Sequence, residues 1–150
     1  MNVKERIRSA VFQCFPEYDV AGQATSWPSA VLSEARLTSE RVAGVATLLH
    51  AMLTGERRGT VVLLAPEGFK GPRLLSKSFV GKGLGSTVQI PFELYWALPP
   101  GGWIVAHGCT LSDVFVGSQS QTQGPDAGSF CLITDETPIG QRLSVRIRFD

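Results

Sequence analysis

His107 and Cys109 are the residues whose chemical types and spacing come nearest to a reactive pair. A cysteine thiolate acts as a nucleophile when a base lies within hydrogen-bond reach, and histidine is a common base. Two residues apart on a strand, the side chains share one face but stand about 6–7 Å apart, which is longer than a hydrogen bond. The pair defines one hypothesis, a small Cys/His thiol enzyme, against which the spacing argues.

The surrounding stretch, residues 87–109, predicts a hairpin around which the sheet is organised. Large apolar side chains alternate along its first half at Val88, Ile90, Phe92, Leu94 and Trp96. A Pro-Pro-Gly-Gly corner at 99–102 then predicts a tight reversal into a partner strand over 103–109. The register that this corner implies pairs Trp96 with Val105, Leu94 with His107, and Phe92 with Cys109. Both candidate residues would then be buried among apolar groups, which disfavours a charged thiolate.

Five cations support a second hypothesis, the binding of nucleic acid or of a phosphate-bearing ligand. If the two strands that carry them are neighbours, all five share one basic face of a sheet. The residues are Arg73, Lys77, Arg142, Arg146 and Arg148. Few aromatic residues are interleaved with them, so stacking on bases is not indicated. The alternative is an ordinary solvated sheet face.

Two further patterns are weaker. The run Gly81-Lys82-Gly83-Leu84-Gly85 superficially resembles a phosphate-binding loop, but a strand rather than a helix follows it. Phe69, Tyr95 and Trp103 lie at or near expected turns, where aromatic side chains can anchor a protein partner or complete the core. No carboxylate pair, metal-ligand spacing or catalytic serine motif is present, so no metal site is expected.

Composition and charge placement are those of a globular protein. Apolar residues make up 43% of the chain and charged residues 18%, with a formal net charge of +1. Cations are concentrated between Arg57 and Lys82, whereas no Lys or Arg occurs from Gly83 through Gln141. This asymmetry can steer a charged partner. The three cysteines are widely spaced, and no apolar leader or membrane-spanning run is apparent, so we expect a reduced, cytoplasmic protein without a membrane partner.

Three helices are expected in the first third of the chain. The first spans 2–14, with Asn2 as its cap and Glu5 completing a capping box. The second runs from about Ser26 to Leu37. The third begins at Thr38 or Ser39 and ends at Thr54, with Gly55 as the terminating glycine. His50 borders the apolar stripe of this third helix and is interpreted as a boundary residue rather than a metal ligand.

From Gly59 onward the apolar period becomes that of strands. Residues 60–65 form a continuous apolar run typical of a central strand covered on both faces. Further strands are expected over 73–80, 87–97, 103–109, 129–134 and 141–149, with a polar loop over 117–128. Pro91 cannot donate a hydrogen bond to a neighbour, so its strand should lie at an edge or turn that position outward. The last strand alternates, with Leu143, Val145, Ile147 and Phe149 expected inward.

These elements predict one α+β domain over 1–150, helical over about 2–55 and β over about 59–150. About three N-terminal helices pack on a mostly antiparallel sheet, or on a small and partly open barrel, of about six strands. The polar residues that a reaction requires do not converge. The favoured function is therefore a non-enzymatic binding or adaptor protein, of the accessory kind, that uses a protein–protein surface and no cofactor. Its partner would be another protein or a second copy of the chain, and the phosphate or nucleic-acid binder and the thiol enzyme stay open as alternatives.

Overall fold

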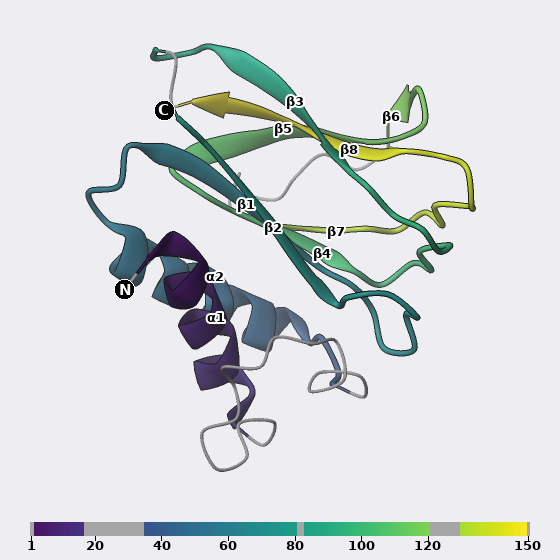
Figure 1. Ribbon diagram of the computed structural model, residues 1–150, viewed down its shortest axis with the longest axis horizontal. Coiled ribbons are helices and arrows are strands. Elements are labelled where there is room, and N and C mark those ends of the chain that lie inside the picture. The colour runs from purple at the N-terminus through teal and green to yellow at the C-terminus, as the bar shows by residue number, and fades with distance from the viewer. Residues whose placement is uncertain (1, 17–34, 81–82, 121–129, 150) are drawn as a thin grey trace.

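The computed structural model describes residues 2–16, 35–80, 83–120 and 130–149. Within these ranges two helices are followed by strands (Figure 1). The helices are α1 (Val3–Cys14) and α2 (Ser39–Leu53). The strands are β1 (Arg58–Leu64), β2 (Leu74–Val80), β3 (Thr87–Phe92), β4 (Trp103–His107), β5 (Cys109–Val116), β6 (Gln119–Ser120), β7 (Phe130–Leu132) and β8 (Leu143–Phe149). The α+β class is confirmed.

The helix ends follow the local sequence. Asn2 caps α1, and its side chain and that of Glu5 form the expected capping box. The Thr38 hydroxyl caps α2 by accepting from the amide of Arg41, and Gly55 adopts the positive φ of 91° that follows the helix. Most of the helix expected over 26–37 lies outside the described residues, and 35–38 are not helical.

The strands form two antiparallel four-stranded sheets rather than one sheet or barrel of about six strands. The first, here called the helix-backed sheet, has the order β2-β1-β4-β7, and the second, the open sheet, has the order β3-β8-β5-β6. The β1–β2 and β5–β6 pairs are joined within a sheet, and each other step along the chain crosses to the opposite sheet. Such crossings are typical of Greek-key and jelly-roll sandwiches. Alternating strands of a sandwich and of a single sheet have the same sequence pattern, which explains the difference.

The expected hairpin over 87–109 is wrong. β3 pairs with β8 in the open sheet, with Phe92 opposite Leu143, whereas β4 pairs with β1 and β7 in the helix-backed sheet. The corner at 99–102 belongs to a connection that crosses between the sheets, and residues 93–97 are not a strand. The three cross-strand pairs inferred from a tight reversal therefore do not form. Pro91 nevertheless lies in an edge strand, as expected.

Two apolar layers hold the molecule together. One lies between the sheets, and the other lies between the helix-backed sheet and the two helices. β1 contributes to both: Val61 and Leu63 face the open sheet, and Val62 and Leu64 face the helices. The prediction of a strand covered on both faces is confirmed. The inward residues expected in the last strand are likewise buried in β8.

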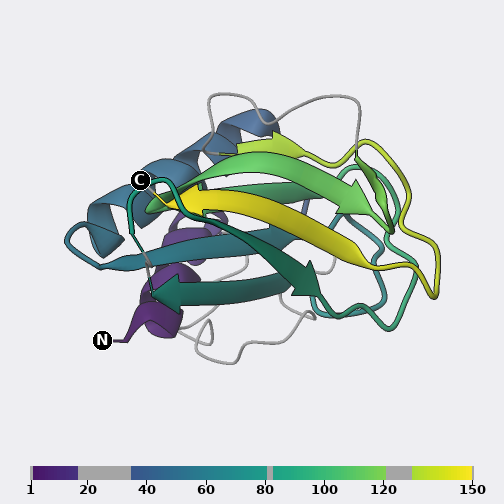
Figure 2. The same cartoon turned by 90° about the horizontal axis from the view of Figure 1, so that it is seen from above.

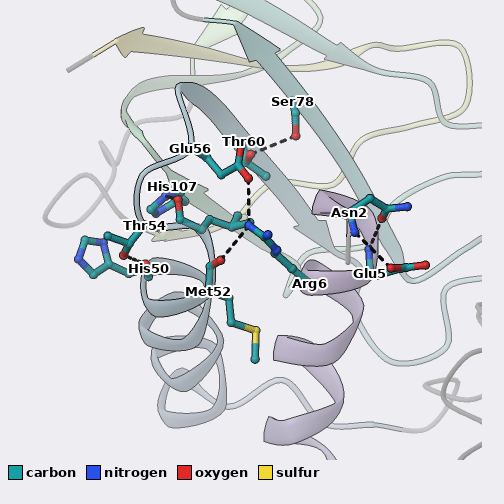
Figure 3. A network of polar contacts seen from close by, with 11 residues as sticks. Asn2, Glu5, Arg6, His50, Met52, Thr54, Glu56, Thr60, Ser78 and His107 are labelled. Carbon is teal, nitrogen blue, oxygen red and sulfur yellow. Dashed lines mark hydrogen bonds and ion pairs between the residues drawn. The ribbon is translucent and has the colours of Figure 1, made fainter.

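Both described helices lie on the outer face of the helix-backed sheet, and neither covers the open sheet (Figures 1 and 2). The junction between α1 and α2 is tied by Arg6 (Figure 3). Its Nη1 donates to the Glu56 carboxylate at 2.9 Å and to the Met52 carbonyl at 3.3 Å.

Candidate binding surfaces

His107 and Cys109 lie in different layers of the structure, the first beside the helices and the second between the two sheets. His107 ends β4 on the helix side, where its Nε2 donates to the Leu53 carbonyl at 3.1 Å. Cys109 begins β5 and is 6% exposed in the layer between the sheets. Gly108, with φ 73°, carries the chain from one sheet to the other between them. Because the residues end and begin different strands, they do not share the strand face on which the thiol-enzyme hypothesis depends.

His50 and His107 are the two histidines of the chain, and α2 and β4 bring them together. Their ring centroids lie 5.5 Å apart with the planes at 67°. His50 is exposed near the end of α2. Within the described ranges no group of three or more His, Cys, Asp or Glu side chains is arranged to hold a metal. The pair is accounted for by edge-to-face packing at the α2–β4 contact.

The cysteines differ in accessibility, and this difference is testable by alkylation. Cys109 and Cys131 are buried, whereas Cys14 is half-buried and burial raises the pKa of its thiol, an effect that the Arg41 cation opposes. The raised pKa leaves less thiolate at neutral pH. We expect iodoacetamide to label native Cys14 slowly, at a rate that rises with pH, and to label Cys109 and Cys131 only in denaturant. Peptide mass spectrometry reads each site, and a Cys109 that reacts faster folded than unfolded would revive the thiol-enzyme hypothesis.

The five cations do not share a surface, because β2 and β8 belong to different sheets. Arg73 is 2% exposed; its Nε donates to the Ala65 carbonyl at 3.0 Å and its Nη2 to the Ala35 carbonyl at 2.8 Å. It joins two chain segments within the fold. Lys77 reaches across to the open sheet, where its Nζ donates to the Pro91 carbonyl and lies 5.9 Å from the Phe92 ring centre.

The remaining three arginines belong to the open sheet. Arg146 and Arg148 are exposed on the outer face of β8, and Arg142 is exposed just before that strand. Arg146 lies 3.6 Å from the Asp113 carboxylate and 5.0 Å from the Phe115 ring centre. The carboxylate offsets its charge, so the row is less basic than the sequence implies. A salt-sensitive polyanion surface gains little support from this arrangement.

The aromatic residues expected near turns differ in exposure: some are packed in the interior, and others project into solvent. Trp103 packs against Phe130 at 5.8 Å between ring centres, on the helix side. Phe69 is 7% exposed beneath Trp96, with ring centres 6.4 Å apart, whereas Tyr95 is 75% exposed beside the same indole. Tyr95 and Trp96 therefore project from the end of the sandwich and stand on a buried aromatic base.

Close packing and main-chain hydrogen bonds hold the segment that carries Tyr95 and Trp96 in place. A Cβ on Gly71 would lie 2.7 Å from both the Phe69 and Trp96 rings, so only a glycine lets the chain pass beneath them. The segment beyond Trp96 pairs with a second loop through two main-chain hydrogen bonds between Leu98 and Thr137, at 2.9 and 2.8 Å. Leu98 and Thr137 are buried, which fixes the second loop beside the aromatic pair.

The second loop carries an apolar residue and two carboxylates. Ile139 is 76% exposed, and Asp135 and Glu136 line a pocket of about 550 Å³ together with polar residues. The remaining lining is Val116, Ser118, Gln119, Ser120, Pro138 and Gln141. We call Tyr95, Trp96 and Ile139 with this pocket the aromatic end of the molecule. Sequence reasoning singled out Tyr95 but missed Trp96 and Ile139, although the absence of Lys and Arg from Gly83 through Gln141 indicated the charge of this end.

Glycines line the opposite end. There, Gly83 and Gly108 border a pocket of about 380 Å³ together with Glu56, Arg57, Arg58, Leu84 and Phe149. β8 begins at Leu143, two residues after Gln141 of the aromatic end, and ends at Phe149 of this pocket, so the two surfaces lie at opposite ends of that strand. Arg57 and Arg58 are not among the cations that the sequence pattern assigns to ligand binding. Lys82 of the glycine run lies outside the described residues.

Comparisons with protein-family models, with curated proteins and with solved structures find no match. Neither described helix combines the length and apolarity needed to cross a membrane.

Proposed function

We propose that the chain is a non-enzymatic binding or adaptor protein that docks a basic segment of a protein partner on its aromatic end. The observation that carries the proposal is the presentation of Tyr95 and Trp96 to solvent, on a fixed base, beside a pocket lined by Asp135 and Glu136. Tyrosine and tryptophan dominate the energetics of protein interfaces because they bury large rigid surfaces. Loops at the end of a rigid scaffold are frequent binding sites.

The charge of this end selects the partner. Among the described residues, the lining of its pocket contains two carboxylates, Asp135 and Glu136, and no Lys or Arg. A Lys or Arg side chain of a partner can enter the pocket at Asp135 and Glu136, and its neighbouring apolar residue can rest on Tyr95 and Ile139. Cationic groups also bind the faces of exposed aromatic rings. These features support a basic partner segment over an acidic one.

Selection from a phage-displayed library of random peptides tests this proposal even though the partner is unidentified. The selected peptides should contain Lys or Arg near an aliphatic or aromatic residue. Tyr95→Ala should weaken their binding at least about tenfold, which is the effect of an interface hot spot, as measured by calorimetry. Leu84→Ala is the matched control, because Leu84 is an exposed apolar residue at the opposite end, 88% exposed.

Two results would contradict the proposal: peptides enriched in Asp and Glu, or selected peptides that bind Tyr95→Ala and wild type equally. A second copy of the chain is the other partner class that the sequence allows, and light-scattering mass measured over a range of concentrations separates it. We further propose that this role is cytoplasmic, which the three free thiols support because disulfides are rare in that compartment.

A further inference from the structure

We propose that the glycine-lined pocket at the end opposite the aromatic end binds the phosphate group of a small molecule. The pocket is defined by Arg57, Arg58, Gly83, Gly108 and Phe149, with Glu56 and Leu84 at its rim. Its residues come from four places in the chain: the α2–β1 connection, the segment before β3, the crossing from β4 to β5, and the end of β8. The site differs from the basic sheet face considered above, and it does not depend on the proposed function.

Among the described residues that line the pocket, Glu56 does not pair with either arginine. Arg57 and Arg58 are exposed, and within the described residues no carboxylate lies within ion-pair distance of either. The Glu56 carboxylate is held 2.9 Å from Arg6 and turns toward that residue (Figure 3). Two exposed arginines therefore line the pocket beside a carboxylate that is already paired with Arg6. Arginine is suited to phosphate because its planar fork donates two parallel hydrogen bonds.

Glycines bring the main chain to the surface of this pocket. A Cβ on Gly108 would collide with the carbonyl oxygen of Arg58, and a Cβ on Gly59 would lie 2.8 Å from the Phe149 ring. Without these side chains, the crossing from β4 to β5 packs directly on the start of β1. At Gly83, by contrast, no atom lies within 4 Å of the position of a Cβ, so a ligand can approach the main chain there, as phosphates do where glycines line a site.

The turn over 83–86 adds an amide donor. Gly83 accepts at its carbonyl from the Ser86 amide at 3.2 Å and the Ser86 hydroxyl at 2.8 Å, and the Gly85 amide donates to Phe149 at 2.9 Å. These bonds fix the turn, and no backbone acceptor among the described residues is paired with the Leu84 amide, whose residue is 88% exposed. Oriented backbone amides beside cations are a common element of anion sites.

The size and lining of the pocket favour a phosphate ester over the bare ion. Its volume of about 380 Å³ lies at the lower end of the range of about 300–1,000 Å³ that is typical of small-molecule sites. Of the two apolar residues that line the pocket, Leu84 is 88% exposed and can contact a ligand, whereas Phe149 is 4% exposed. We infer a ligand with one phosphate group, placed at Arg57 and Arg58, and a small organic part that rests against Leu84.

Titration calorimetry in a phosphate-free buffer, with inorganic phosphate and phenyl phosphate as separate probes, tests the proposal. Both should bind saturably, phenyl phosphate more tightly, and affinity should fall as salt is added. Equal affinities would support the phosphate site and assign it to the free ion. The double variant Arg57→Ala/Arg58→Ala should lose at least tenfold, and Arg57→Lys/Arg58→Lys should lose less because it keeps the charge but not the fork.

Arg142→Ala is the control, since it removes an exposed arginine at the far end of β8. Circular dichroism checks that each variant is folded, and amide shifts of Gly83 and Gly108 in NMR spectra locate the probe in the wild-type chain. The proposal is overturned if neither probe binds, if Arg57→Ala/Arg58→Ala binds as wild type does, or if Arg142→Ala weakens binding equally.

Discussion

Arg73→Ala should lower the free energy of unfolding by about 3 kcal/mol and the melting temperature by about 6–12 °C. The guanidinium is buried and bridges the Ala65 and Ala35 carbonyls, and hydrogen bonds from a charged donor contribute about 1.5–3 kcal/mol each. Its removal leaves both oxygens without this donor and opens a cavity beside them. Relief of the cost of burying the charge offsets part of this loss. A change of about 3 kcal/mol in a chain of this length corresponds to the stated temperature shift.

Thermal unfolding followed by circular dichroism measures the effect, with Arg148→Ala as the matched control. Arg148 is exposed on the open sheet, so its loss should change stability by no more than about 0.5 kcal/mol. Arg73→Lys keeps a positive charge but not the fork that spans two carbonyls, and it should recover only part of the stability. If Arg73→Ala has the same melting temperature as the wild type, Arg73 does not join the two segments as described.

Gly108→Ala should destabilise the chain by about 2–5 kcal/mol, as read from the midpoint of urea unfolding. The residue has φ 73°, which costs an alanine about 1–2 kcal/mol. The added Cβ would also collide with the Arg58 carbonyl oxygen, and the backbone shifts needed to relieve this cost a further 1–3 kcal/mol, roughly the cost of overpacking. The strain falls on the link between the two sheets.

Gly140→Ala separates the two causes. Gly140 has φ 89°, but no atom lies within 4 Å of the position of its Cβ, so only the conformational cost of about 1–2 kcal/mol applies. The difference between the variants therefore measures the close approach of β1 to the crossing. Equal losses in the two variants would show that the approach at Gly108 does not constrain the fold.

Local features of the fold could be predicted from the sequence because they depend on neighbouring residues. The Asn2–Glu5 capping box, the alternation of β8 and the buried run of β1 all follow from spacing alone. Pairing could not be predicted in the same way. The apolar row of β3 fits any core face, and its partner β8 begins at Leu143, far along the chain, so pairing it with the nearest strand is wrong.

The candidate sites divide similarly. The position of Tyr95 near a turn and the absence of Lys and Arg from Gly83 through Gln141 indicated an exposed aromatic residue and an acidic surface. The pocket at Asp135 and Glu136 could not be predicted, because its position depends on the pairing of Leu98 with Thr137. Arg73 is an error in the other direction: the alternating pattern of the expected strand placed it among the cations of an exposed sheet face, whereas it is buried. Its burial depends on two carbonyls from distant segments that no local pattern reveals.

Photocrosslinking from the aromatic end tests the proposed function most directly. A benzoylphenylalanine placed at position 95 or at position 115, in the cells from which the sequence derives, compares two aromatic positions. Tyr95 projects from the aromatic end, whereas Phe115 lies on the uncovered face of the open sheet beside Arg146. The expected result is a covalent complex with a basic protein from position 95 and none from position 115. A complex formed from position 115 alone would contradict the proposal and assign partner binding to the open sheet.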